Sequence, residues 1–134
     1  MIRILVIDDE LGISEIICEA LKPFGYAVET AINGRQGIER FNDTIYDLVV
    51  TDFGLPDIDG NSVIRHIRNS CRPFTPVIGI SGTPWLLEGS DCDAVLSKPF
   101  PLRALIELVK RLTRFSPANT SPFRGLPLDD RPAL

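Results

Sequence analysis

Five short apolar segments, separated by stretches with a helical pattern, constrain the fold of this chain more than any other feature. Four lie at residues 2–7, 47–51, 77–80 and 94–96, and a weaker one lies at 27–30. The segments at 2–7 and 77–80 are apolar at successive positions rather than at alternate ones. This is typical of strands in a parallel sheet that is covered on both faces. We therefore predict five strands that form such a sheet.

Helical patterns fill most of the intervals between these segments. Apolar residues recur with i, i+3, i+4 and i+7 spacing along residues 13–21 and 102–112, and shorter helices are predicted at 35–41 and 62–68. The alternation of strand and helix predicts an α/β fold, a doubly wound sheet wrapped by helices on both sides. Only residues 85–90 separate Pro84 from the Asp-rich start of the last strand, so the fourth helix should be shortened to about two turns at most.

The length and the cysteine content indicate one domain in a reducing compartment. A chain of 134 residues has room for one hydrophobic core. Cys18, Cys71 and Cys92 are an odd number without C-x-x-C spacing, which fits neither a secreted disulfide scaffold nor a zinc site. We expect a cytoplasmic protein with a folded domain at residues 1–114. Low apolar periodicity and regular prolines predict a Pro-rich, disordered tail at 115–134.

Two classes of partner are disfavoured by the distribution of apolar and charged residues. The apolar run at 4–7 is too short for a signal-peptide core or for a membrane span. The net charge is -4, and the arginines are scattered singly rather than clustered into a basic face. We expect no membrane association and no direct binding of nucleic acid by this chain.

Polar and charged residues follow four of the five predicted strands. Ligands of open parallel sheets bind beyond the carboxyl ends of the strands, where the strand order reverses. The first strand ends in Asp8 and Asp9, the third in Asp52 and the fourth in Ser81, and the last runs within two residues of Lys98. Three carboxylates, one hydroxyl and one ammonium group should therefore meet at one edge of the sheet.

This set of groups predicts a divalent metal and a phosphoryl group. Crowded carboxylates repel one another, and their pKa values would rise unless a cation held them ionised. A set of oxygen ligands favours Mg²⁺, or Mn²⁺, over zinc, and Mg²⁺ in proteins commonly shares a site with a phosphate. Lys98 would neutralise phosphoryl oxygens, Ser81 would donate a hydrogen bond, and one carboxylate would be the nucleophile. An acyl phosphate on an aspartate is the expected product.

Four sequence motifs resemble those of response-regulator receiver domains in two-component signalling. They are IDDE at residues 7–10, TDFGLPDIDG at 51–60, GISG at 79–82 and KPF at 98–100. The motifs occur in the family's order, each at the end of a predicted strand, and the similarity covers about residues 2–114. It implies the flavodoxin-like strand order 2-1-3-4-5.

The resemblance also implies a metal site. Asp9 would ligate Mg²⁺ directly, and Asp8 would do so largely through water. Asp52 and the backbone carbonyl of Gly54 would complete the protein ligands.

The same resemblance implies a phosphorylation chemistry. Asp52 would accept a phosphoryl group from the phosphohistidine of a histidine kinase or of a phosphotransfer protein. Lys98 would pair with that group, and Ser81 would move toward it to report phosphorylation. The Lys98-Pro99 bond is cis in many relatives, which is plausible because the trans preference at X-Pro is only about 0.5–1 kcal/mol.

Two features depart from the family pattern. The family usually carries an aromatic switch residue three positions before the lysine, where this chain has Val95, and the span from Ser81 to Lys98 is several residues shorter than usual. A small β-branched side chain cannot swing between exposed and buried rotamers with comparable effect. The signal should therefore leave by an altered surface, which could include Trp85.

Three functions compete at this point. The leading one is a stand-alone receiver that signals through altered contacts with an unknown effector protein, and that catalyses at most the slow loss of its own phosphoryl group. The second is an interaction module that keeps the fold without switching through phosphate, as Val95 suggests. The third is a phosphatase of the haloacid-dehalogenase type with Asp8 and Glu10 as its acidic pair, which would leave Asp52 and Lys98 unexplained. His66, in a predicted helix, is interpreted as a surface histidine.

Overall fold

The computed structural model describes residues 1–83 and 90–117 as a parallel sheet covered by helices. Five strands form the sheet in the order β2-β1-β3-β4-β5. The strands are β1 (Arg3–Ile7), β2 (Ala27–Ala31), β3 (Leu48–Asp52), β4 (Val77–Ser81) and β5 (Ala94–Ser97). The helices are α1 (Leu11–Leu21), α2 (Gly34–Asp43), α3 (Gly60–Arg68) and α4 (Leu102–Thr113), with a short 3₁₀ helix η1 (Lys22–Phe24). The predicted α/β class and the strand order 2-1-3-4-5 are confirmed.

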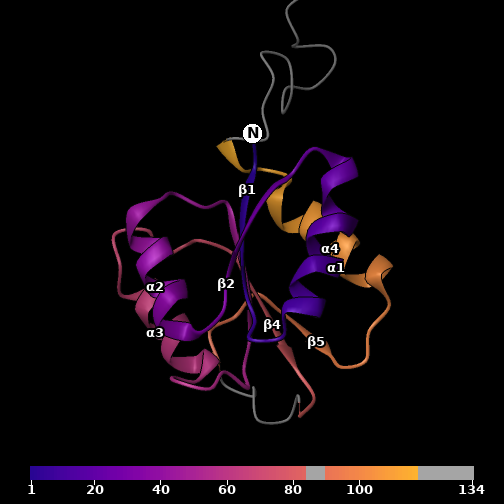
Figure 1. The fold of residues 1–134 in the computed structure, drawn as a ribbon. Coiled ribbons are helices and arrows are strands. Elements are labelled where there is room, and N and C mark those ends of the chain that lie inside the picture. Colours follow the sequence, from indigo (N-terminus) through magenta and orange to yellow (C-terminus); the bar gives the residue numbers. More distant parts are fainter. Residues whose placement is uncertain (84–89, 118–134) are drawn as a thin grey trace, which may run out of the picture.

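Two helical layers enclose the sheet, with α1 and α4 on one face and α2 and α3 on the other (Figure 1). Successive side chains of a strand point to opposite faces. Ile4 and Val6 of β1 therefore join the core that contains α1 and α4, whereas Leu5 and Ile7 join the core that contains α2 and α3. Burial on both faces explains why this strand is apolar at successive positions.

The boundaries of several elements differ slightly from the prediction. The third and fourth strands each run one residue further than expected, so that Asp52 and Ser81 are the last residues of β3 and β4. The predicted short fourth helix falls at residues 85–90, of which 85–89 lie outside the described residues, and most of the predicted tail, 118–134, lies outside them as well. Within the described ranges, no helix is long and apolar enough to span a bilayer.

The register of the sheet brings the carboxyl ends of its central strands to one edge. The paired residues there are Ile7 with Thr51, Asp52 with Ile80, and Ser81 with Ser97. The end of β3 packs closely against α3. A Cβ atom added to Gly60 would lie only 2.9 Å from the carbonyl oxygen of Asp52. Glycine at the first position of α3 thus permits the close approach of this helix to the end of β3.

Arg68, the last residue of α3, ties the opposite, amino-terminal edge of the sheet together. Its guanidinium donates to the carbonyl oxygens of Pro73 (2.8 Å), Thr75 (2.7 Å) and Asp91 (2.6 Å), and to the carboxylate of Asp93 (2.9 Å). These acceptors belong to the segments that lead into β4 and β5. One side chain therefore joins α3 to two strands.

We expect Arg68→Ala to lower the free energy of unfolding by about 2–3 kcal/mol, because it leaves four acceptors, two of them partly buried, without their donor. Urea denaturation followed by circular dichroism measures the change. Arg65→Ala on the same helix is the matched control, since the Arg65 guanidinium makes an exposed hydrogen bond to the Ser62 hydroxyl at 3.1 Å. Equal losses in the two variants would show that the contacts of Arg68 carry no special weight.

Candidate functional site

Asp52 is the last residue of β3, and its carboxylate is held by groups from two loops. The side chain of Asp52 is 7% exposed. Lys98 Nζ donates to Asp52 Oδ2 at 3.0 Å, and the backbone N–H of Gly54 donates to Asp52 Oδ1 at 3.1 Å. Lys98 follows β5, so the ion pair links strands that are separated by β4 in the sheet. The structure thus brings Asp52 and Lys98 together as the sequence predicted.

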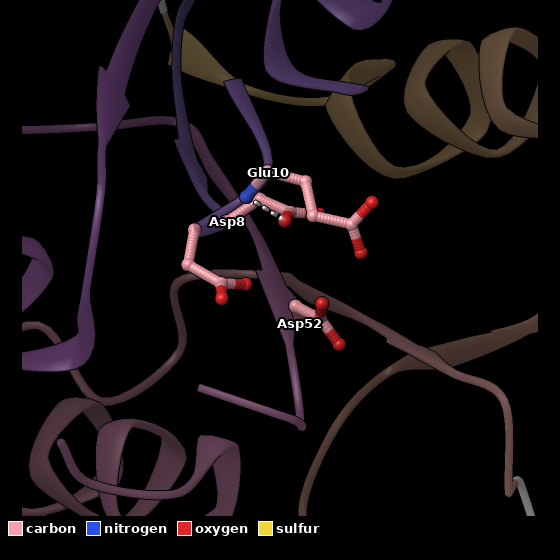
Figure 2. Close-up of side chains that lie close together, drawn as sticks. Asp8, Glu10 and Asp52 are labelled. Carbon is pink, nitrogen blue, oxygen red and sulfur yellow. Dashed lines mark hydrogen bonds between the residues drawn. The ribbon is translucent and has the colours of Figure 1, made fainter. Parts of the chain in front are cut away.

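Asp52 also belongs to a cluster of four carboxylates. One oxygen each from Asp8, Asp9, Glu10 and Asp52 lies within 4.8 Å of the others. Figure 2 shows Asp8, Glu10 and Asp52 close together in this cluster. Because like charges at this spacing repel one another, the cluster is suited to a cation. Three of these carboxylates, those of Asp8, Asp9 and Asp52, are predicted metal ligands, whereas Glu10 had no predicted role in the receiver.

Asp8 carries the strongest sign that a ligand belongs here. It is 1% exposed, and one of its oxygens, Oδ1, accepts a hydrogen bond from the Glu10 N–H at 2.9 Å. The other oxygen, Oδ2, is buried and has no hydrogen-bond partner among the described residues. Burial raises the pKa of Asp8 from 3.8 to about 6, against the effect of the Glu10 hydrogen bond and with a contribution from the charge of Asp52. An oxygen-binding divalent cation such as Mg²⁺ fits this donor set.

Lys98 supplies positive charge beside the carboxylates. Its Nζ also lies 3.7 Å from Glu10 Oε1. Partial burial alone would lower the pKa of Lys98, but the hydrogen bond to Asp52 and the surrounding carboxylates outweigh it, so that the pKa is raised. Lys98 therefore stays protonated at neutral pH and can neutralise a further anion.

Ser81 ends β4 and lines the same cavity as Asp52 and Lys98. It is 4% exposed, and its hydroxyl oxygen accepts a hydrogen bond from the Thr83 N–H at 2.9 Å. The Thr83 hydroxyl lies 3.2 Å from Ser81 Oγ. Thr83 also lines the cavity, although no sequence motif assigns it a role. Its place two residues after a strand end is the signal that could have indicated it.

The residues given other interpretations lie elsewhere in the fold. His66 Nε2 is 2.7 Å from Asn42 Oδ1 on the neighbouring helix α2. The three cysteines are free thiols, of which Cys71 is exposed. Val95, in β5, is 40% exposed.

The peptide bond between Lys98 and Pro99 is cis, as the resemblance implied.

Comparison with known proteins identifies this arrangement. A family profile described as a response regulator receiver domain matches residues 4–110. The chain belongs to the response regulator receiver domain family. The sequence resemblance is therefore confirmed, and the carboxylate cluster lies in a fold whose members act in two-component signalling.

Curated relatives of this receiver domain include proteins named as transcriptional regulators. The chain is 32% identical over 120 residues to the transcriptional regulatory protein TrcR of Mycobacterium tuberculosis, covering 86% of this chain and 46% of TrcR. It is 35% identical over 119 residues to the transcriptional regulatory protein DltR of Streptococcus agalactiae, covering 85% of this chain and 53% of DltR. The chain therefore spans about half the length of these relatives.

Solved structures share the fold of this receiver domain. The response regulator TrrA from Thermotoga maritima, in complex with Mg²⁺ and BeF, is 35% identical with a TM-score of 0.76, covering 84% of this chain and 99% of TrrA. The chemotaxis response regulator CheY4 of Vibrio cholerae is 24% identical with a TM-score of 0.78, covering 84% of this chain and 98% of CheY4. The latter likeness concerns the fold alone.

Proposed function

We propose that this receiver domain accepts a phosphoryl group on Asp52 from the phosphohistidine of a histidine kinase or phosphotransfer protein, in the cytoplasm and with Mg²⁺ bound. The observation that carries the proposal is the contact of Lys98 Nζ with Asp52 Oδ2 at 3.0 Å, at the edge of a cluster of four carboxylates. A nucleophile, a cation for the transferred group and a set of metal ligands are thereby supplied by neighbouring strand ends.

The transfer itself needs little from the protein beyond position and charge. An oxygen of the Asp52 carboxylate forms the new O–P bond as the N–P bond of the phosphohistidine breaks, and the electron pair of that bond stays on the donor imidazole. Lys98 holds the phosphoryl oxygens, and Ser81 turns its hydroxyl from Thr83 toward them. Lys98 and Ser81 thereby stabilise the negative charge of the phosphoryl oxygens, which enters the site only with the donor.

The metal is proposed to lie among Asp8, Asp9, Asp52 and the backbone carbonyl of Gly54. The partnerless Oδ2 of the buried Asp8 supports a cation at this place. Mg²⁺, or Mn²⁺ in its stead, supplies charge neutralisation to the carboxylates and the phosphoryl oxygens when bound. TrrA, with 35% identity, is in complex with Mg²⁺ and BeF, and this also supports a magnesium site.

The output of the reaction is proposed to be a change in protein contacts. Val95 is 40% exposed at the position where the family usually has an aromatic switch, so another surface is expected to report phosphorylation to an effector protein or domain.

The exposure of Val95 also favours a second candidate function, an interaction module whose binding does not depend on phosphate. A phosphatase with Asp8 as nucleophile is less favoured, because the cavity is lined by Asp52 and not by Asp8, which is the more deeply buried of the two.

Phosphorylation by a small donor tests the proposal. We expect the wild-type chain with Mg²⁺ and phosphoramidate to gain one acid-stable, base-labile phosphoryl group, seen by intact mass, with a change in the fluorescence of Trp85, the single tryptophan. Asp52→Asn and a chelator should each abolish both signals. Phosphoryl incorporation that persists in Asp52→Asn would overturn the assignment of the acceptor. An Asp52→Asn chain that binds its effector as tightly as phosphorylated wild type would favour the phosphate-independent module.

A further inference from the structure

Glu10 has a side chain that the start of helix α1 does not use. It is the N-cap residue of α1, yet its carboxylate makes no capping hydrogen bond. The backbone carbonyl of Glu10 instead accepts from the N–H groups of Ile13 and Ser14, both at 3.1 Å. The side chains that commonly cap the first turn are the shorter ones of Ser, Thr, Asp and Asn. The Glu10 carboxylate is therefore available for another contact.

That contact is with the ammonium group of Lys98 in the candidate site. Lys98 Nζ lies 3.7 Å from Glu10 Oε1 and 3.0 Å from Asp52 Oδ2, so one ammonium group is shared by two carboxylates. Figure 2 shows the carboxylates of Glu10 and Asp52 close together. The charge of Glu10 contributes to the raised pKa of Lys98.

The two carboxylates differ in how firmly they are held. The side chain of Glu10 is 59% exposed, whereas that of Asp52 is 7% exposed. An exposed ion pair of this kind contributes little to stability. Glu10 can therefore leave Lys98 at small cost, whereas Asp52 is fixed at the end of β3.

We propose that Glu10 is a positioning residue that competes with the incoming phosphoryl group for Lys98 and so slows the phosphorylation of Asp52. This inference rests on the proposed function. During transfer, the Asp52 oxygen forms its O–P bond while the N–P bond of the donor breaks and its electron pair leaves with the donor nitrogen. The phosphoryl oxygens take the place of Glu10 at Lys98, and the Glu10 side chain swings toward solvent.

Charge gives the direction and the size of the effect. A donor phosphoryl group is anionic, so a carboxylate at the rim of the cavity repels it and also occupies its binding partner. Unit charges about 4 Å apart interact by about 1 kcal/mol even in bulk water, which corresponds to several-fold in rate. We expect Glu10→Gln to be phosphorylated by phosphoramidate about 3- to 10-fold faster than wild type at low salt and saturating Mg²⁺.

Salt and a matched variant separate this role from a general charge effect. The acceleration by Glu10→Gln should shrink at high salt, because exposed charges are screened over about 3 Å at 1 M ionic strength. Glu15→Gln removes an identical charge from an exposed position on the same helix and should phosphorylate at the wild-type rate. Equal acceleration in both variants, or none in Glu10→Gln, would overturn the proposal.

A magnesium titration separates competition for Lys98 from direct metal ligation. If Glu10 competes for Lys98, Glu10→Gln should weaken Mg²⁺ binding by only a few-fold, because it removes a nearby negative charge. Phosphorylation of this variant at saturating Mg²⁺ should become faster. A loss of more than about 100-fold in Mg²⁺ affinity together with slower phosphorylation would assign Glu10 to the metal and overturn the proposal. Glu10→Ala should behave as Glu10→Gln does. If the wild-type chain takes up no phosphoryl group on Asp52, the proposed function itself fails.

Discussion

A Lys98→Met variant is expected to lose at least about 100-fold in the rate of phosphorylation on Asp52. Methionine keeps much of the length and volume of lysine but removes the ammonium group that lies 3.0 Å from the acceptor carboxylate. Removal of one group that stabilises charge in a transition state typically lowers the rate by about 10²–10³-fold. The rate is measured by intact mass after mixing with phosphoramidate at saturating Mg²⁺.

The same variant should also be less stable without metal. In the wild-type chain, Lys98 offsets the charge of Asp52, whose side chain is 7% exposed. Loss of one partner of a buried pair costs about 3–5 kcal/mol, and the 26% exposure of the Lys98 side chain reduces this to about 2 kcal/mol. Lys22→Met in η1 removes an exposed ammonium group and is the control. A Lys98→Met chain that phosphorylates within threefold of wild type would exclude the proposed role of Lys98.

A second large effect is expected in the pH dependence of stability of the metal-free chain. The pKa of Asp8 is about 6 in the folded chain, against an ordinary value of 3.8. Between these values the folded chain holds a proton that the unfolded chain has released, so stability falls as pH rises from about 4 to about 6.5. Each unit of pKa difference corresponds to 1.36 kcal/mol, which gives a loss of about 3 kcal/mol from this group.

Asp8→Asn should lack this loss, because the amide has no proton to release over this range. Urea denaturation of both chains at pH 4.5 and pH 7, with a chelator, measures the difference between their slopes. At pH 7, saturating Mg²⁺ should restore stability to the wild type and have little effect on Asp8→Asn. Asp43→Asn, an exposed carboxylate at the end of α2, is the control and should follow the wild type. Identical pH profiles for wild type and Asp8→Asn would contradict the assignment of the raised pKa.

The meeting of Asp52, Ser81 and Lys98 could be predicted because it depends on topology. Parallel strands place their carboxyl ends at one edge, so residues that follow different strands become neighbours whatever the details of packing. The register of β3 and β4 bears this out, with Asp52 opposite Ile80. The strand order followed from the resemblance of the four motifs to a known family.

The roles of Glu10 and Arg68 could not be predicted in this way. A glutamate at the start of a helix carries no pattern that indicates its partner, and only the side-chain rotamer directs the Glu10 carboxylate toward Lys98. Arg68 lies on a helix pattern that indicates only an amphipathic surface, whereas its acceptors are three carbonyl groups and one carboxylate of irregular segments up to 25 residues away in the sequence. Neither rotamers nor loop carbonyls leave a periodic trace in the sequence.

The contacts of Arg68 imply that local stability is graded along the strands. At the amino-terminal edge, one guanidinium binds the segments before β4 and β5, whereas the carboxyl-terminal edge carries four neighbouring carboxylates. Backbone opening, observed as amide hydrogen exchange, should therefore be slowest near Thr75 and Val77 and faster toward Ser81. The strand ends that would have to rearrange around a phosphoryl group are then those that open most readily. Because Arg68 holds the amino-terminal edge of the sheet, the motion of the strands should be confined to the carboxyl-terminal edge.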